Sequence, residues 1–355
     1  MTRRLGGLSN LSVVGLVVLL VAGWLIAGQL TAATATIVVS ALYFAIPASS
    51  FNFLYGSLGI FSLMQPVFAA AGGYTTAYLF NAHHVSPWIS LAIAPIVAAI
   101  IAVPVAFAAV RAGTGPVLTA LVTLIISEAV PAILVGVKPL GGAVGLYVDV
   151  PPTPSFSDLQ FVSPTTYVRI FLVLNVLVLA FLIWWRNSRY GLYVTAVKDS
   201  PDAAEAVGIP TARIRIVTIV ISGMMASFGG VIYAQYNLLS TPDLFLGEAA
   251  LFQVIVIALV AGVDRPWGTL VAAMLIVYIS NKATDWADGR QGVGPLVFAA
   301  IFVLVALVMP RGITGTWAQI RANRSGRPSA GARREHTEEP LAMSSNLSGT
   351  GSSEA

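Results

Sequence analysis

The sequence predicts an all-α polytopic membrane protein with about ten transmembrane or partly re-entrant helices. Of its 355 residues, 57% are hydrophobic and only 10% are charged, whereas a soluble domain carries about 25% charged residues because water must solvate its surface. Several apolar runs reach the roughly 20 residues that cross the hydrocarbon core as a helix. The lipid bilayer is therefore the expected solvent of most of the chain.

Ten apolar runs are the candidate spans. The first is longer than the core of a secretory signal peptide, so we expect a retained helix there. The third carries Pro66 and several glycines, and the eighth and ninth are short for complete spans. In order, the runs lie near residues 11–30, 35–54, 58–80, 88–110, 116–136, 165–185, 214–238, 249–263, 266–281 and 292–310.

The positions of Lys and Arg predict the orientation, because cytoplasmic flanks retain positive charge. With the N-terminus inside and ten alternating spans, the outer side receives only Lys138, Arg169, Lys282 and Arg290. The inner side receives the basic C-terminal tail and a longer series: Arg3, Arg4, Arg111, Arg186, Arg189, Lys198, Arg213, Arg215, Arg265 and Arg311. We therefore expect a multi-pass protein with both termini in the cytoplasm.

Residues 1–310 form the expected transmembrane domain, with two segments that leave the membrane. An external Gly- and Pro-rich loop covers 137–164, and an internal loop of mixed charge covers 186–213. Residues 311–355 are rich in Ser, Gly, Arg and Glu and nearly lack large apolar side chains. Such a composition predicts a disordered cytoplasmic tail. Its basic first part could lie against anionic lipid headgroups, and the alternative is a solvated tail.

The internal loop contains the signals of a short helix. Ser200, Pro201 and Asp202 supply a cap, a proline at the first helical position and an acidic first turn. Gly208 and then Pro210 supply the stop. A rigid, small-faced helix of about two turns on the cytoplasmic face could seat in a groove of a soluble partner. The alternative is an ordinary loop helix without a partner.

Residues 202–208 read D-A-A-E-A-V-G and resemble the E-A-A-x-x-x-G coupling motif of ATP-binding-cassette importer permeases. A wider likeness to the LivM-type permeases of branched-chain amino acid importers covers about residues 37–310. It rests on A-V-K-D at 196–199, A-A-E-A-V-G-I at 203–209, G-G-V-I-Y-A at 229–234, Y-G-S-L-G at 55–59, A-G-G-Y-T-T-A at 71–77, L-T-A-L-V-T-L at 118–124 with Glu128, and A-G at 261–262 with W-G-T at 267–269.

The resemblance implies that the helix transmits force from separate ATP-binding subunits. Its coupling residues would be Asp202, Ala203, Ala204, Glu205 and Gly208. The implied partners are two ATP-binding subunits, a second permease subunit of LivH type, an extracytoplasmic substrate-binding protein and membrane lipid, in the cytoplasmic membrane of a prokaryote. The external run L-G-G-A-V-G-L at 140–146 lacks the acidic or amide residue that the family carries there. The substrate is thus a branched-chain amino acid or another small polar solute, such as an amide or urea.

Six residues are candidates for the translocation path: Glu128, Thr123, Gly72, Gly73, Ser222 and Gly230. Glu128 is an acidic residue deep within a span, which usually faces a cavity or a partner. The glycines of the third span could break its helix and turn backbone carbonyls toward a cavity. The alternative for the small residues is plain helix packing. Asn52, Gln65 and Asn175 are expected to form interhelical hydrogen bonds.

Other functions lack the necessary residues. No G-x-x-x-x-G-K-[ST] phosphate loop occurs, so ATP and Mg²⁺ are expected on the partner subunits and no cofactor on this chain. The chain has no Cys, and His83 and His84 have no third metal ligand in view. Topology explains the net charge of +4, and we expect no nucleic-acid partner. An enzyme would need a convergent set of polar residues. A stand-alone secondary transporter or channel is the alternative, but it predicts several ionisable residues within the spans.

Overall fold

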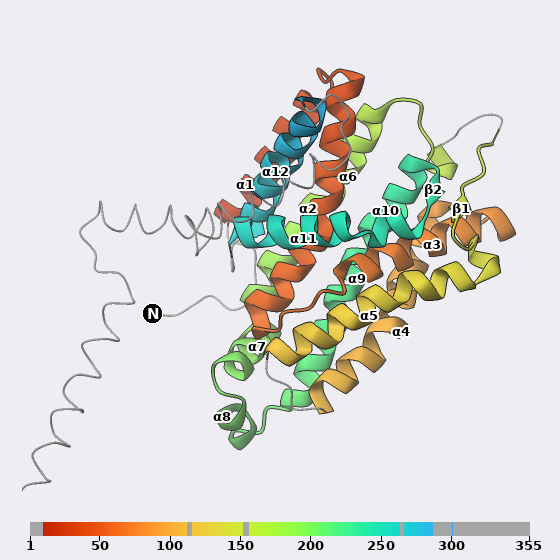
Figure 1. Cartoon of the computed structure of the whole chain (residues 1–355). Coiled ribbons are helices and arrows are strands. Elements are labelled where there is room, and N and C mark those ends of the chain that lie inside the picture. The colour runs from red at the N-terminus through yellow and green to blue at the C-terminus, as the bar shows by residue number, and fades with distance from the viewer. Residues whose placement is uncertain (1–9, 112–115, 152–155, 263–265, 287–299, 301–355) are drawn as a thin grey trace, which may run out of the picture.

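The computed structural model describes residues 10–111, 116–151, 156–262, 266–286 and 300. The described part is almost entirely helical (Figure 1), which confirms the predicted all-α class. The helices are α1 (Asn10–Ala27), α2 (Ala32–Leu58), α3 (Gln65–His83), α4 (Pro87–Arg111), α5 (Pro116–Gly136), α6 (Pro164–Asn187), α7 (Arg189–Asp199), α8 (Pro201–Ala206), α9 (Thr211–Asn237), α10 (Pro242–Leu246), α11 (Glu248–Ala261) and α12 (Pro266–Trp286).

Six stretches of the described chain are long and apolar enough to cross a membrane. They are Ala32–Leu58, Pro87–Arg111, Leu118–Gly136, Pro164–Asn187, Thr211–Asn237 and Pro242–Ala261, the last formed by α10 and α11 together. Helices α1, α3 and α12 correspond to three further expected spans. The tenth expected span, at 292–310, and the tail at 311–355 lie outside the described residues.

The third expected span differs from its sequence-based interpretation. Helix α2 ends at Leu58, Gly59 adopts a left-handed conformation with φ 70°, and α3 begins only at Gln65. Pro66 lies in the first turn of α3. A backbone N–H at this position would have no partner within the helix, so its absence in proline costs no hydrogen bond. Helix α3 then runs without interruption through Gly72 and Gly73. The break therefore falls at residues 59–64, before the glycines rather than at them.

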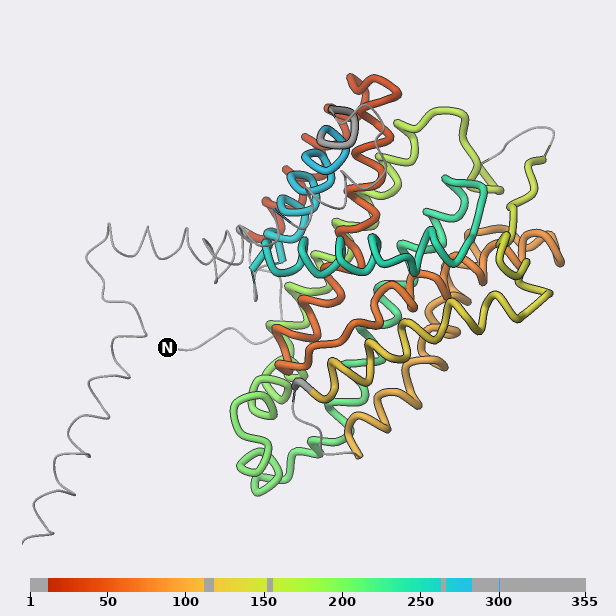
Figure 2. The backbone as a smooth tube through the Cα atoms, in the orientation of Figure 1, coloured from red at the N-terminus to blue at the C-terminus, as the bar shows by residue number. Residues whose placement is uncertain are grey.

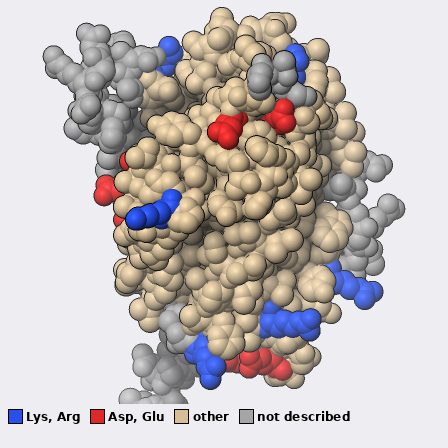
Figure 3. Space-filling model, turned by 90° about the vertical axis from the view of Figure 1, so that its right-hand side faces the viewer, with Lys and Arg blue, Asp and Glu red and all other residues tan. Residues whose placement is uncertain are grey.

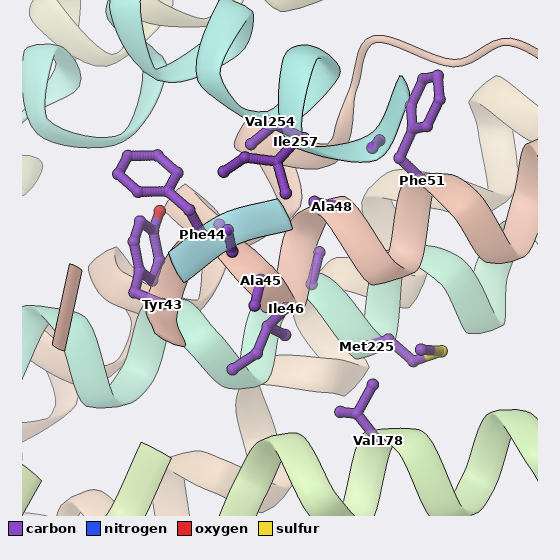
Figure 4. Close-up of a cluster of buried hydrophobic side chains, with 14 of the residues drawn as sticks. Tyr43, Phe44, Ala45, Ile46, Ala48, Phe51, Val178, Met225, Val254 and Ile257 are labelled. Atoms are coloured by element: carbon purple, nitrogen blue, oxygen red, sulfur yellow. The ribbon is translucent and has the colours of Figure 1, made fainter. Parts of the chain in front are cut away.

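Helix α2 lies at the centre of the bundle, with 78% of its most apolar window buried. Figure 4 shows its side chains Tyr43, Phe44, Ile46 and Phe51 with Val178 of α6, Met225 of α9, and Val254 and Ile257 of α11. Tyr43 also stacks on Tyr233 of α9, with ring centroids 3.8 Å apart. Helix α11 crosses α2 at a steep angle (Figure 2) and closes one side of this core.

The loop at 137–164 folds into a small cap over the part of it that the structure describes. It contains η1 (Lys138–Leu140), β1 (Leu146–Tyr147) and η2 (Phe156–Asp158). Strand β1 pairs antiparallel with β2 (Leu239–Ser240), with Leu146 opposite Ser240. Asn81 of α3 donates to the Tyr147 carbonyl, and Gln160 donates to the Asp149 carbonyl at 2.8 Å. The bond from Asn81 fixes the cap on α3, and a bond of 3.3 Å from the Gln160 amide to the Gln235 side-chain oxygen joins it to α9.

Helices α3 and α9 approach each other so closely that only glycine fits at two positions. A Cβ atom added at Gly72 would overlap the backbone carbonyl of Ser227, and one added at Gly230 would overlap that of Ala69. At Gly229, by contrast, the added atom would lie 3.4 Å from the Ile46 side chain, an ordinary contact. Small residues of this kind let helix backbones meet in a membrane.

We expect Gly230→Ala to destabilise the protein and the adjacent Gly229→Ala to leave it as stable as the wild type. The alanine at 230 must push two backbones apart, and overpacking of this kind costs about 1–3 kcal/mol. The measurement is the thermal midpoint of the detergent-solubilised protein. Equal midpoints for the two variants would show that the α3–α9 contact is not as close as described.

Candidate functional site

The loop at 186–213 forms two short helices rather than one. Ser188 caps α7 by accepting a hydrogen bond from the Gly191 N–H at 3.2 Å. Ser200 caps α8 in the same way through the Ala203 N–H at 3.4 Å, and Pro201 is the first helical residue. Gly208, with φ +84°, turns the chain after α8. Helix α8 thus lies where the sequence places it, whereas α7 was not predicted.

Helix α8 presents most of its surface to solvent. Asp202 and Ala203 are exposed, and Val207, just beyond its end, is 75% exposed. Ala204 alone of its residues is buried. Glu205 is also exposed, but its carboxylate accepts a hydrogen bond from the Thr211 hydroxyl at the start of α9. Of the five residues expected to couple, Ala204 and Glu205 therefore connect α8 to the body and Asp202 and Ala203 face outward.

Helix α7 connects the loop to the central helix. Val194 and Val197 are buried against the body, and the Lys198 ammonium donates a hydrogen bond of 2.6 Å to the Gly56 carbonyl of α2. Lys198 and Asp199 also line a polar cavity of about 330 Å³ between α2, α6, α7 and α12, together with Asn52 and Thr195. No local sequence signal pointed to the contact between Lys198 and Gly56, because 142 residues separate them.

Ser222 lies within a buried hydrogen-bond network that joins three helices. Its hydroxyl donates to the Ser50 carbonyl of α2 at 3.0 Å and accepts from the Gln65 amide of α3 at 3.2 Å. The Ser50 hydroxyl donates back to the Ser222 carbonyl. Gln65 thus forms the interhelical hydrogen bonds expected of it, as do Asn52 with the Ala258 carbonyl and Asn175 with the Leu42 carbonyl, both at 3.0 Å.

The glycine candidates lie at helix contacts as well. Gly72 and Gly230 form the close approach between α3 and α9, and Gly73 faces the Phe245 ring of α10. All three are buried. Together with Ser222 they form one cluster of contacts in the centre of the bundle, and none of them lines the cavity of about 330 Å³.

Thr123 and Glu128 both lie on α5 but face nearly opposite directions. Thr123 is buried, and its hydroxyl accepts a hydrogen bond of 3.1 Å from the Leu63 N–H in the non-helical segment 59–64. The same hydroxyl donates to the Thr119 carbonyl at 2.9 Å. Glu128 is exposed. The described structure therefore does not bring the six path candidates together around one cavity.

A second, mostly apolar cavity of about 480 Å³ lies between α3, α4 and α5. Tyr74, Val97, Val130 and Leu134 are among the residues that line it. The Tyr74 hydroxyl is buried and has no hydrogen-bond partner within the described chain. The lining has too few polar groups to solvate a zwitterion, so this cavity alone does not form a path for a polar solute.

Charged side chains are unevenly distributed over the surface. Figure 3 shows Lys, Arg and acidic side chains at the lower end of one face, at the height where α7 and α8 lie in Figure 1, further charged side chains near its upper end and at its left edge, and a broad uncharged region between them. This separation suits a protein whose middle faces lipid and whose end faces water.

Comparison with known proteins gives a consistent result. Residues 33–306 match the family model described as "Branched-chain amino acid transport system / permease component". A probable branched-chain amino acid transport permease protein LivH of Methanocaldococcus jannaschii is 22% identical over 287 residues, which are 75% of this chain and 87% of that protein. The high-affinity permease protein LivM of Salmonella typhimurium is 25% identical over 74% of this chain and 65% of its own length.

A shorter match extends the range of named substrates. The nucleoside ABC transporter permease protein NupB of Lactococcus lactis subsp. cremoris is 29% identical over 151 residues, which are 40% of this chain and 39% of that protein. No solved structure matches the chain.

The hydrogen bond between Thr123 and Leu63 is open to a direct test. Thr123→Val keeps the shape of the side chain but leaves the Leu63 N–H unpaired, which costs about 1–3 kcal/mol for a buried donor. We expect a lower thermal midpoint for this variant, measured in detergent, whereas Thr123→Ser retains the hydroxyl and the wild-type midpoint. A stable Thr123→Val protein would mean that segment 59–64 is held by other contacts.

Proposed function

The chain belongs to the family of permease components of branched-chain amino acid transport systems and is a membrane subunit of an ATP-binding-cassette importer, and we propose that it forms half of that importer's translocation path. The observation that supports a driven permease best is the helix pair α7–α8 at one end of the bundle. A stand-alone transporter or channel would have no use for a rigid, exposed helix of this kind.

We propose that α8 is the coupling helix on which an ATP-binding subunit acts. Its outward residues Asp202 and Ala203, with the exposed Val207 beside them, offer one carboxylate and a small apolar surface to a groove. Ala204 and Glu205 face the body and Gly208 ends the helix. The surface is small, which suits a contact that must follow a moving partner.

Two hydrogen bonds would pass a movement of α8 to the spans. Glu205 links α8 to the first turn of α9 through Thr211. Lys198 links the preceding helix α7 to the last turns of α2 through the Gly56 carbonyl. Helices α2 and α9 are both central to the bundle, so a displacement at α7–α8 would reach the core directly.

The remaining partners follow from the family and stay proposals. Two ATP-binding subunits would carry ATP and Mg²⁺, since this sequence has no phosphate loop, and the chain itself would have neither a cofactor nor an enzymatic activity. A second permease subunit of LivH type would complete the path. An extracytoplasmic binding protein would dock on the face that carries the β1–β2 cap, opposite α7–α8. Both chain termini would then lie in the cytoplasm.

The substrate that we propose is a branched-chain amino acid or a related small polar solute. The named substrates of the relatives support this class, and the nucleoside permease among them shows why a wider class is kept. We further propose that Gly72, Gly73, Ser222 and Gly230 pack helices rather than contact the solute, because all four are buried at helix contacts. Thr123 is likewise buried, at its hydrogen bond to Leu63, so that Glu128 alone of the six path candidates is exposed.

Reconstitution tests the proposed function. The chain would be co-expressed with candidate ATP-binding subunits and a candidate second permease subunit, purified, and placed in proteoliposomes. We expect ATP hydrolysis to rise when the binding protein is added with leucine, and leucine uptake to require ATP. Uptake that persists without the ATP-binding subunits would instead support a stand-alone transporter.

The coupling helix is tested by Asp202→Ala combined with Gly208→Ala. The second change places a side chain at φ +84°, where L residues are strained, and the first removes the outward carboxylate. We expect at least a roughly tenfold loss of uptake, since 1.4 kcal/mol of lost contact free energy corresponds to a factor of ten. Gly136→Ala is the control, because an added Cβ meets nothing there. Assembly and uptake both intact in the double variant would refute the coupling role.

Loss of the hydrogen bond between α7 and α2 is expected to change the ratio of ATP hydrolysed to solute transported. Lys198→Met removes a charge-assisted hydrogen bond that contributes about 1.5–3 kcal/mol but keeps the length of the side chain. We expect ATP hydrolysis to continue while uptake falls, so that more ATP is used per solute transported. Arg111→Met, at the exposed end of α4, should change neither rate. A Lys198→Met importer with the wild-type ratio of ATP to solute would exclude this bond from coupling.

A further inference from the structure

Glu128 is an ionisable side chain exposed on the surface of a membrane-spanning helix. Helix α5 covers Pro116–Gly136, so Glu128 lies about 18 Å from its first residue and about 12 Å from its last at 1.5 Å per residue. The carboxylate makes no hydrogen bond or ion pair with the described part of the chain. A position at this depth would place an unpartnered carboxylate against hydrocarbon, which is strongly unfavourable.

The exposed faces of the neighbouring helices are different. On α4 the exposed large side chains are apolar, among them Ile96, Ile100 and Phe107. Helix α1 likewise exposes valines, Leu25 and Ile26. These faces suit lipid. Among the exposed faces of α1, α4 and α5, only that of α5 carries an ionisable residue in its middle.

Helix α5 is also the least covered of the candidate spans. Only 17% of its most apolar window is buried, compared with 28% for α4 and 78% for α2. Its inner face carries Thr119, Thr123 and Ser127 at intervals of four, all buried. Its outer face carries Leu121, Ile125, Glu128 and Ala132, all exposed, at spacings of four, three and four residues, which form a single stripe along a helix.

We propose that this outer stripe of α5 is the surface on which the second permease subunit of the importer packs, with a hydrogen-bond donor of one of its membrane helices opposite Glu128. The inference rests on the proposed function, which requires two permease subunits. The depth of Glu128 excludes the soluble ATP-binding subunits and the external binding protein as occupants. Leu121 and Ile125, which are 50% and 67% exposed, supply the apolar contacts that flank the donor.

Site-specific photo-crosslinking in the complete importer tests the proposal. The photoreactive residue p-benzoylphenylalanine is placed at Leu121 or Ile125 on the stripe, and at Ile96 or Ile100 on α4 as matched controls. After illumination of native membranes, mass spectrometry identifies each adduct. We expect adducts with the second permease subunit from the two α5 positions and lipid adducts alone from the two α4 positions.

Three results would overturn the proposal. They are lipid adducts alone from the stripe, adducts with a second copy of this chain, and adducts with residues 292–310 of the same chain, which would mean that its own tenth span covers α5. If the wild-type chain retains no ATP-binding subunit and supports no uptake, the proposed function fails and this inference with it. If uptake is normal but the stripe labels only lipid, the interface alone is wrong.

Substitutions at Glu128 give a second measurement. Glu128→Leu removes the acceptor, and we expect roughly a tenfold smaller fraction of the second permease subunit to co-purify with the tagged chain. Glu128→Gln keeps an acceptor oxygen and should retain most of it, and Ile100→Leu should retain all of it. Size-exclusion chromatography of the tagged chain alone checks that each variant folds. Unchanged or improved co-purification with Glu128→Leu would assign this face to lipid.

Discussion

Hydrocarbon offers no hydrogen bonds to a protein backbone, so every backbone polar group that faces it must find its partner inside the protein. Most of this chain meets that condition by being helical. Residues 59–64, where α2 has ended and α3 has not begun, cannot do so through a helix. There the Thr123 hydroxyl of α5 accepts from the Leu63 N–H. The Thr123 side chain thereby satisfies a backbone donor in the break between α2 and α3 and attaches α5 to this segment.

The same constraint shapes the contacts among α2, α3 and α9. Lipid tails are as apolar as the side chains that face them, so helices associate through close packing and hydrogen bonds rather than through hydrophobic burial alone. Gly72 and Gly230 allow α3 and α9 to meet backbone to backbone. Ser50, Gln65 and Ser222 then lock both helices to α2. The result is a closely packed centre in which three helices are joined by hydrogen bonds.

Two parts of the protein, the helix pair α7–α8 and helix α5, attach to this centre in different ways. The helix pair α7–α8 is bound to it by Lys198 and Glu205 through two specific hydrogen bonds. Helix α5 has little buried surface and touches the centre through its inner face, near Thr123. A loosely packed helix with a carboxylate on its outer face can shift between arrangements at a smaller free-energy cost than a buried one such as α2. Movement in the importer would then be concentrated at α5, next to a partner.

The sequence by itself determined the membrane class, helices at nine of the ten expected positions, six of them long and apolar enough to cross a membrane, and the short helix α8. Composition, run length and the cap residues Ser200, Pro201 and Gly208 are local signals, and the bilayer and the helix ends respond to them directly. Only the tertiary structure showed that the helix break lies at 59–64 and that α7 exists. It also showed that Ser222 faces Gln65 and that Glu128 faces away from the bundle. Helical periodicity states which residues share a face. It does not state what that face meets, because the answer depends on helices far away in the chain.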